Sequence, residues 1–237
     1  MTMGHDAASF VLVHGAWHGG WCWDSVATRL RELGHAVTVI PQLSSAGPNP
    51  AELGDLQTDA AHVRAELDAF DDERGVVLVG HSYGGMVISE LAGHPAVRHA
   101  VYLAAFWPTL GQPLFGFLPD AEPDWLEFGP EDTMRIVRDR AVDAFYHDCD
   151  PVVAKEAAER LVYQSTASAS TPSTFTGWGT VPTTYVVATE DRVLPPELQR
   201  QLSRQASRVV EIASGHSPFL SMPDTLAEAL TGTTSPV

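Results

Sequence analysis

A serine between two glycines is the first feature of this sequence that could do chemistry. Ser82 lies at the centre of the pentapeptide 80–84, which reads Gly-His-Ser-Tyr-Gly. An apolar, β-branched run precedes it at 76–79, and a run that can form a helix follows at 85–92. Strand, tight turn and helix are the context in which G-x-S-x-G presents a nucleophilic serine above a sheet. Glycines flank the serine because side chains there would crowd the strand and the helix. We therefore expect Ser82 to be a catalytic nucleophile.

A serine nucleophile needs a base, and the base needs an acid that orients it. With this motif, the chain order is serine, then acid, then histidine. Asp191 follows a predicted strand at 183–188, and His216 follows another at 208–213. Both therefore come after the carboxyl ends of strands, where open parallel sheets bind their ligands. We predict that His216 is the base and that Asp191 is the acid, with the adjacent Glu190 as the alternative acid.

An acyl-transfer site also needs backbone N–H groups aimed at the oxyanion of the tetrahedral intermediate. One should come from Tyr83, the residue after the nucleophile, and the other from the loop after the first predicted strand, at 10–13. We choose Ala16 as this second donor. His14 and His18 on the same loop are expected to be structural, with side chains hydrogen-bonded to the loop backbone. No metal site is expected, because no Cys/His cluster with ligand spacing occurs.

These motifs together resemble the α/β-hydrolase superfamily. The run 11–23, VLVHGAWHGGWCW, is similar to the branch that holds plant methyl-ester esterases, hydroxynitrile lyases and small bacterial esterases. The likeness covers nearly the whole chain, and it implies the same triad and the same oxyanion hole as the residues above. It departs from the lyases at one position. Those enzymes carry a lysine directly after the catalytic histidine, where this chain has Ser217.

The expected function is that of a serine hydrolase. It would cleave a neutral, moderately hydrophobic carboxylic ester, such as an aryl or methyl ester, through an acyl-enzyme, and this chemistry needs no cofactor. One alternative is a lyase or cyclase that uses the same triad to move protons. Another is a ligand receptor that keeps the triad but turns over very slowly.

Alternating strands and helices must position these residues. The alternation predicts an α/β-hydrolase fold with a mainly parallel sheet of about six strands and helices on both faces. The predicted strands cover residues 10–13, 36–40, 76–79, 98–105, 183–188 and 208–213. The predicted helices cover residues 23–33, 56–70, 85–92, 196–205 and 224–230. The stretch 42–54, rich in Pro, Ser and Gly, is predicted to be a loop.

The alternation stops in the proline-rich segment 108–178, which has two or three helical runs and no convincing strand. We predict a helical cap there, inserted in a core formed by 1–107 and 179–237. The Ser/Thr/Ala-rich stretch 165–176 is expected to be a loop or hinge with solvated hydroxyls. Aromatic residues of the cap and its surroundings are expected to form an apolar pocket wall. The predicted substrate-binding residues are Trp17, Phe106, Trp107, Trp125 and Trp178.

Composition narrows the function further. The 237 residues include 30 acidic and 14 basic side chains, a formal net charge of −16, which disfavours binding to nucleic acid or to anionic membranes. No 18-residue apolar stretch or signal-peptide pattern is evident. The two cysteines, Cys22 and Cys149, are expected to be free thiols, as in a reducing compartment. We therefore expect a cytoplasmic monomer or homodimer whose partner is a small-molecule ester.

Overall fold

Six parallel strands form the central sheet of the protein. The computed structural model describes residues 7–71, 73–117, 123–177 and 179–233. The strand order in the sheet is β10-β9-β5-β4-β1-β2, and every neighbouring pair is parallel. The strands are β1 (Ser9–Val13), β2 (Ala36–Val39), β4 (Val76–His81), β5 (Val97–Leu103), β9 (Thr183–Ala188) and β10 (Arg208–Ile212). The predicted α/β fold and its parallel sheet are confirmed.

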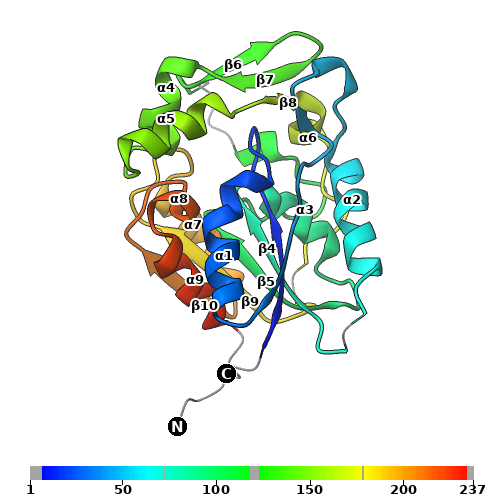
Figure 1. Ribbon diagram of the computed structural model, residues 1–237. Coiled ribbons are helices and arrows are strands. Elements are labelled where there is room, and N and C mark those ends of the chain that lie inside the picture. The colour runs from blue at the N-terminus through cyan, green and yellow to red at the C-terminus, as the bar shows by residue number, and fades with distance from the viewer. Residues whose placement is uncertain (1–6, 72, 118–122, 178, 234–237) are drawn as a thin grey trace.

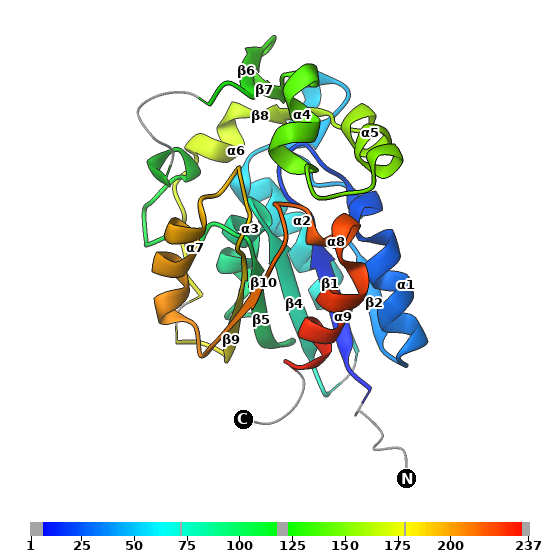
Figure 2. The ribbon, with the colours of Figure 1, turned by 90° about the vertical axis from the view of Figure 1, so that its left-hand side faces the viewer.

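Helices cover both faces of this sheet (Figures 1 and 2). Successive side chains of a strand point to opposite faces, so β4 contributes to two hydrophobic clusters. The helices that flank the sheet are α1 (Asp24–Glu32), α2 (Leu56–Asp68), α3 (Gly84–Leu91), α7 (Pro196–Leu202), α8 (Pro218–Ser221) and α9 (Pro223–Thr231). Val77 and Val79 of β4 pack with α1 and α9, whereas Val76 and Leu78 pack with α2 and α3.

A second, smaller sheet lies beyond the carboxyl ends of the parallel strands (Figure 1). It is antiparallel, with the order β3-β8-β7-β6. Its strands are β3 (Ala46–Gly47), β6 (Leu126–Gly129), β7 (Thr133–Ile136) and β8 (Tyr163–Ser165). The helices beside it are α4 (Arg138–Phe145), α5 (Pro151–Glu159) and α6 (Thr166–Ser170). We call the strands β6 to β8 with α4 to α6 the cap.

The prediction of a cap without strands is wrong. Strands β6 and β7 form a hairpin whose turn contains Glu131 and Asp132, with φ of 53° and 51°. Turns with positive φ match the twist of paired strands, but they usually contain Gly or Asn. The acidic turn therefore gave no sequence signal. Strand β3 comes from the predicted loop 42–54 and pairs with β8, so the cap sheet includes a piece of the core segment. The boundaries proposed for the cap and the core stay predictions.

The Ser/Thr/Ala-rich stretch 165–176 also differs from its prediction. It includes α6, and the side chains of Ser165, Ser168 and Ser173 are buried. The Ser165 hydroxyl accepts the amide N–H of Ala167 and so caps α6, and the Ser168 hydroxyl donates to the carbonyl of Ser165. Short hydroxyl side chains can satisfy nearby backbone groups in this way, and this lets them enter the interior.

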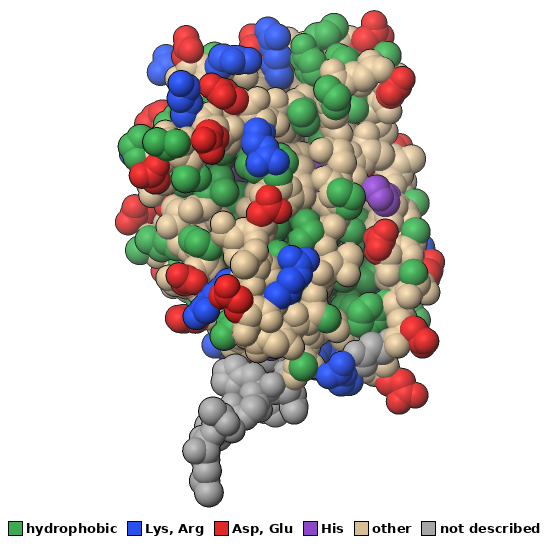
Figure 3. Space-filling view, viewed as in Figure 1, with side chains coloured by type: hydrophobic (Ala, Val, Ile, Leu, Met, Phe, Trp, Pro, Cys, Tyr) green, Lys and Arg blue, Asp and Glu red, His purple; other side chains and the backbone are tan. Residues whose placement is uncertain are grey.

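The surface is mixed in charge. On the face shown in Figure 3, Lys and Arg side chains lie among Asp and Glu side chains. In the described part of the chain, no helix is both long and apolar enough to cross a membrane. Both cysteines are free thiols, as predicted, with Cys22 buried in the core and Cys149 partly buried.

Candidate active site

Ser82 occupies a strained turn between β4 and α3. Its φ is 51°, a left-handed conformation that a non-glycine residue rarely adopts, and its side chain is buried. A Cβ at Gly80 would lie 2.5 Å from the carbonyl oxygen of Gly84, and a Cβ at Gly84 would lie 2.8 Å from that of His14. Only glycine fits at either position. The predicted nucleophile elbow therefore has the tight packing and the strain that its sequence indicates.

Asp191 and His216 form a buried pair. The imidazole Nδ1 of His216 donates to the Asp191 carboxylate oxygen Oδ2 at 2.7 Å, and both side chains are at most 1% exposed. They follow β9 and β10, as predicted. The alternative acid, Glu190, is exposed to solvent. Geometry therefore selects Asp191 over Glu190 as the partner of the histidine.

Three further donors hold the Asp191 carboxylate. Its Oδ1 accepts the amides of Val193 and Leu194 at 2.8 and 2.9 Å, and its Oδ2 accepts Gln199 Nε2 at 2.8 Å. The first two bonds come from the turn into α7, whereas Gln199 lies within that helix. Sequence reasoning missed Gln199, because a polar residue on a short helix carries no signal of burial.

Neighbouring residues fix the loop of His216 as well. His81 Nε2 donates to the backbone carbonyl of His216 at 2.9 Å, and the two rings are 4.7 Å apart. The amide of Gly215 donates to the carboxylate of Asp148 at 2.7 Å, a contact from the cap side of the molecule. Sequence reasoning missed Asp148 too, since its partner is distant in sequence. The loop of His216 is thus held by both the core and the cap.

The residues that follow Asp191 and His216 have different surroundings. Arg192 forms an ion pair with Asp143 of α4. Ser217 is fully buried, and its hydroxyl has no hydrogen-bond partner in the described part of the chain. Arg192 is therefore paired with a residue of the cap. Position 217, where the lyases carry a lysine, holds a neutral side chain.

Ala16 and Tyr83 are both buried residues, and neither backbone N–H donates a hydrogen bond to any described residue. Buried amides without partners are rare in folded proteins, so such a pair beside a strained serine indicates a binding site for an oxygen atom. Both were selected from the sequence for this role.

Two histidine side chains donate hydrogen bonds to carbonyl groups of the loop that contains Ala16. His14 Nδ1 donates to the carbonyl of Gly15 at 2.8 Å, and His18 Nδ1 donates to that of Ala16 at 2.8 Å. The prediction that these two histidines bond to the loop backbone is confirmed. Burial, which disfavours the charged form, lowers the pKa of His14 to about 4 and that of His18 to about 3. Across the described residues, no three His, Cys, Asp or Glu side chains are grouped to hold a metal ion.

The lowered pKa values predict that acid destabilises the fold. Between pH 6.5 and about 4, an unfolded chain protonates His14 and His18 while the folded protein leaves them neutral, so the free energy of unfolding falls as the pH falls. Each histidine should contribute a loss of about 2 kcal/mol between pH 7 and pH 5. Urea unfolding of His18→Gln at both pH values should show a fall about 2 kcal/mol smaller than that of the wild type. An unchanged pH dependence in His18→Gln would refute the prediction.

An apolar cavity adjoins Ser82. Three predicted substrate-binding residues, Trp17, Phe106 and Trp125, line it. Trp107 does not, because its ring stacks on a core tyrosine, and Trp178 lies outside the described residues. A large apolar side chain fits the core equally well, and a role of Trp107 in substrate binding stays a prediction. The remaining lining residues are Ala16, Tyr83, Leu114, Leu126, Met134, Gln164, Ser168, Ala169 and Val193.

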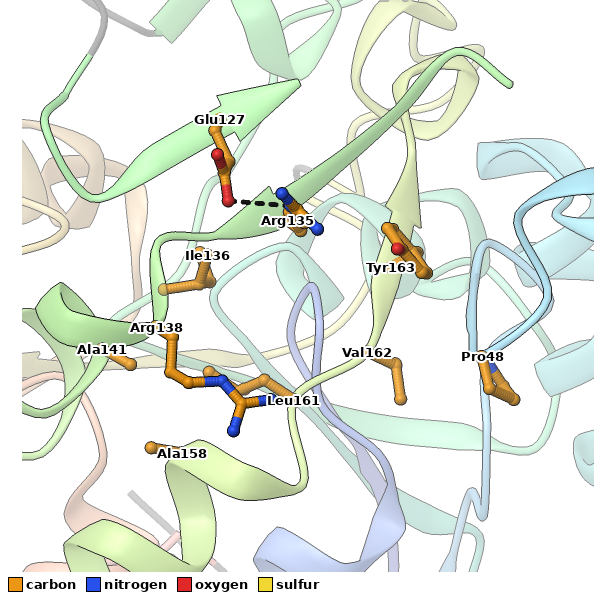
Figure 4. A pocket seen from close by; sticks show the side chains of 10 residues that line it. All are labelled: Pro48, Glu127, Arg135, Ile136, Arg138, Ala141, Ala158, Leu161, Val162 and Tyr163. Atoms are coloured by element: carbon orange, nitrogen blue, oxygen red, sulfur yellow. Dashed lines mark ion pairs between the residues drawn. The ribbon is translucent and has the colours of Figure 1, made fainter. Parts of the chain in front are cut away.

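A second hollow, of about 470 Å³, lies at the cap and is lined by residues of β6, β7 and β8 among others (Figure 4). Met134 of β7 lines the cavity at Ser82, whereas the next residue, Arg135, lines this outer hollow. Arg135 is paired there with Glu127 at 2.8 Å. Asp191 and His216 line neither of these two spaces, but Ser82 lines only the inner one, so the cavity at Ser82 is the candidate active site.

The sequence matches the family described as "Alpha/beta hydrolase family" over residues 10–229. The chain belongs to this family. This α/β hydrolase is 34% identical over 244 residues to a carbendazim hydrolyzing esterase from Nocardioides sp. (strain SG-4G). The match covers 94% of this chain and 98% of that relative. The chain is 29% identical over 260 residues to Methylesterase 7 from Arabidopsis thaliana, covering 95% and 96%. Among solved structures, a pyrethroid hydrolase from Sphingobium faniae JZ-2 superposes with a TM-score of 0.83 at 27% identity, covering 96% and 97%.

Proposed function

We propose that this α/β hydrolase cleaves carboxylic esters through an acyl-enzyme on Ser82. The observation that carries the proposal is the buried 2.7 Å hydrogen bond between Asp191 and His216, whose loop is bonded at the His216 carbonyl by His81, the residue before the strained Ser82. Relatives named as an esterase, a methylesterase and a pyrethroid hydrolase support the same reaction class.

In the first half-reaction, His216 takes the proton of the Ser82 hydroxyl as the oxygen attacks the ester carbonyl. Asp191 holds the proton on Nδ1 of His216, so Nε2 is the acceptor, and its charge stabilises the imidazolium that forms. The Ala16 and Tyr83 amides stabilise the oxyanion. The imidazolium then protonates the departing alkoxide. A water molecule, activated by the same base, hydrolyses the acyl-enzyme in the second half-reaction.

The substrate is proposed to be a neutral small-molecule ester with an apolar, preferably aromatic, group. Trp17, Phe106 and Trp125 supply aromatic walls to the cavity at Ser82. No Asp, Glu, Lys or Arg is among its described lining residues, so a charged group entering it would lose water without gaining an ion partner. The free thiols of Cys22 and Cys149 favour a cytoplasmic location, where the protein would act as a monomer or homodimer.

A lyase on the same triad is the main rival, and the buried Ser217 argues against it. Cyanohydrin cleavage leaves cyanide, whose developing charge needs a cation in a dry site. The neutral Ser217 hydroxyl replaces the lysine that the lyases carry at this position.

We therefore expect the purified protein to release phenol from aryl esters and to release no cyanide from mandelonitrile above the buffer rate. Both substrates are assayed side by side, with Ser82→Ala as the control for contaminating enzymes. Cyanide release without ester cleavage would favour the assignment as a lyase. Tight binding of esters with almost no release of alcohol would favour the assignment as a ligand receptor.

A further inference from the structure

A chain of buried hydrogen bonds runs from the residue that follows Ala16 to the side chain of Tyr83, and it passes through the cap. It begins at Trp17, the residue after Ala16, whose backbone N–H donates to Gln164 Oε1 at 3.1 Å. Gln164 lies on the cap strand β8, and its Nε2 donates to the hydroxyl of Ser45 at 2.7 Å. Trp17 and Gln164 are 147 residues apart in sequence, so only the docked cap brings them together.

The chain ends on the carboxylate of Asp59, which is fully buried on α2. Asp59 Oδ2 accepts the hydroxyl of Ser45 and also that of Tyr83, the latter at 2.7 Å. Asp59 Oδ1 accepts the Ser45 amide at 2.9 Å and the Ser44 hydroxyl at 2.7 Å. Four donors on one buried carboxylate make strong, charge-assisted bonds. The carboxylate thereby anchors the side chain of Tyr83, whose backbone amide is the other proposed oxyanion donor.

Every bond in this chain has a fixed direction. The Trp17 amide can only donate, so Gln164 must present its oxygen to Trp17 and its nitrogen to Ser45. The Ser45 hydroxyl accepts from Gln164 and must therefore donate onward to Asp59. The negative charge of Asp59, at the end of this chain of hydrogen bonds, keeps all the donors pointing toward it. A neutral amide in place of Asp59 would force at least one hydrogen bond to reverse.

The peptide groups on both sides of Ala16 are held in place by these contacts. His14 bonds the carbonyl of the preceding peptide, which turns the N–H of Ala16 to the opposite side. The following peptide is held at its oxygen by His18 and at its nitrogen by Gln164. Trp17 itself has a φ of 62°, which is rare for a bulky residue. The cap keeps it there with two more bonds, since Trp17 also accepts a backbone amide next to β8 and donates its indole N–H to a carbonyl of β7.

We propose that Gln164 and Asp59 are positioning residues that set the direction and spacing of the two oxyanion amides. This role rests on the proposed ester hydrolysis. Both N–H groups of the Gln164 amide are already used, one by Ser45 and one by Ser168 at 2.7 Å, so the side chain has no donor left for a substrate. Because Gln164 belongs to the cap, the oxyanion hole reaches its working geometry only when the cap is docked on the core.

The test compares Gln164→Leu, Asp59→Asn and Tyr83→Phe with the wild type. None of them removes a backbone amide or a member of the triad. We expect each to lower kcat by about 10- to 100-fold, as a small misplacement of catalytic groups does, while KM changes less than about threefold. The affinity for an aryl trifluoromethyl ketone, which forms a tetrahedral oxyanion on the serine, should fall by the same factor as kcat.

A matched control is available on α3. The Glu90 carboxylate is also buried, and it accepts the Ser173 hydroxyl at 2.9 Å and the Thr174 amide at 2.7 Å, with no link to either oxyanion amide. Glu90→Gln should lower the melting temperature and leave kcat and inhibitor affinity within about twofold. The double variant Gln164→Leu/Tyr83→Phe should lose little more activity than the worse single variant, because both substitutions interrupt one chain.

Circular dichroism and thermal unfolding identify the folded variants. Folded Gln164→Leu and Tyr83→Phe proteins whose kcat and inhibitor affinity stay within about twofold of the wild type would overturn the positioning role. Tyr83→Phe removes one hydroxyl only, so it decides the question if the other variants do not fold. A wild type that hydrolyses no ester, or a Ser82→Ala variant with full activity, would instead refute the proposed function, and the positioning role with it.

Discussion

Replacing Ser82 by alanine is expected to lower kcat for an aryl ester about a million-fold, the loss found when a serine nucleophile is removed elsewhere. The substitution removes one oxygen atom from a site whose backbone is held by packing between β4 and α3, so the fold should persist. Substrate binding should change little, because the walls of the cavity remain. Release of phenol from a phenyl ester under saturating substrate measures the effect.

Ser89→Ala is the matched control for this variant. Ser89 is equally buried and lies on the helix that follows the elbow, where its hydroxyl donates to a carbonyl of the same helix at 2.7 Å. Its loss should leave kcat within about threefold, as expected for a side chain away from the reacting atoms. If Ser82→Ala kept more than a hundredth of the wild-type kcat, the hydrolysis would not proceed through an acyl-serine.

The second large effect is expected at the acid. Asp191→Asn should lower kcat by about 10³- to 10⁴-fold, because an amide cannot hold the imidazole in the tautomer that accepts a proton from serine. In this protein the change is more disruptive still. The carboxylate accepts four donors, and an amide nitrogen in its place would face at least one of them.

Glu190→Gln is the natural comparison, since it removes the neighbouring carboxylate and leaves the buried pair intact. Glu190 is exposed, so we expect its loss to change kcat less than about tenfold. Steady-state kinetics of both variants with one ester decide between them. The reverse ranking would assign the role of the acid to Glu190.

The sequence predicted those parts of the fold and the site that depend on local pattern. Alternating strands and helices predicted the parallel sheet, and G-x-S-x-G predicted the strained turn at Ser82. Asp191 and His216 could be found because each follows a strand whose end lies at the same edge of the sheet. In each case a local pattern of strand, turn and helix marks the residue, even where its partner is distant, as with Asp191 and His216, which are 25 residues apart.

The parts that the sequence did not predict depend on contacts between distant segments. Strands β6 and β7 are four residues each, and their acidic turn does not resemble a typical hairpin turn. Trp107 stacks on Tyr102 at 4.0 Å in the core, which no local pattern distinguishes from a place in the pocket wall. The sequence does contain a sign that Asp59 is buried, because Asp59 lies on the same helix face as the apolar Ala60 and Val63. A carboxylate on such a face needs partners, but its partners, at 44–45 and 83, come from two other segments of the chain.

Covalent labelling tests the central claim most directly. The native protein is incubated with a fluorophosphonate probe, digested, and analysed by mass spectrometry to locate the modified residue. We predict one adduct, on the peptide that contains Ser82, and its loss in Ser82→Ala. We also predict much slower labelling of the His216→Ala variant, which lacks the base. An adduct on another serine, or unchanged labelling of Ser82→Ala, would contradict the assignment of Ser82 as the nucleophile.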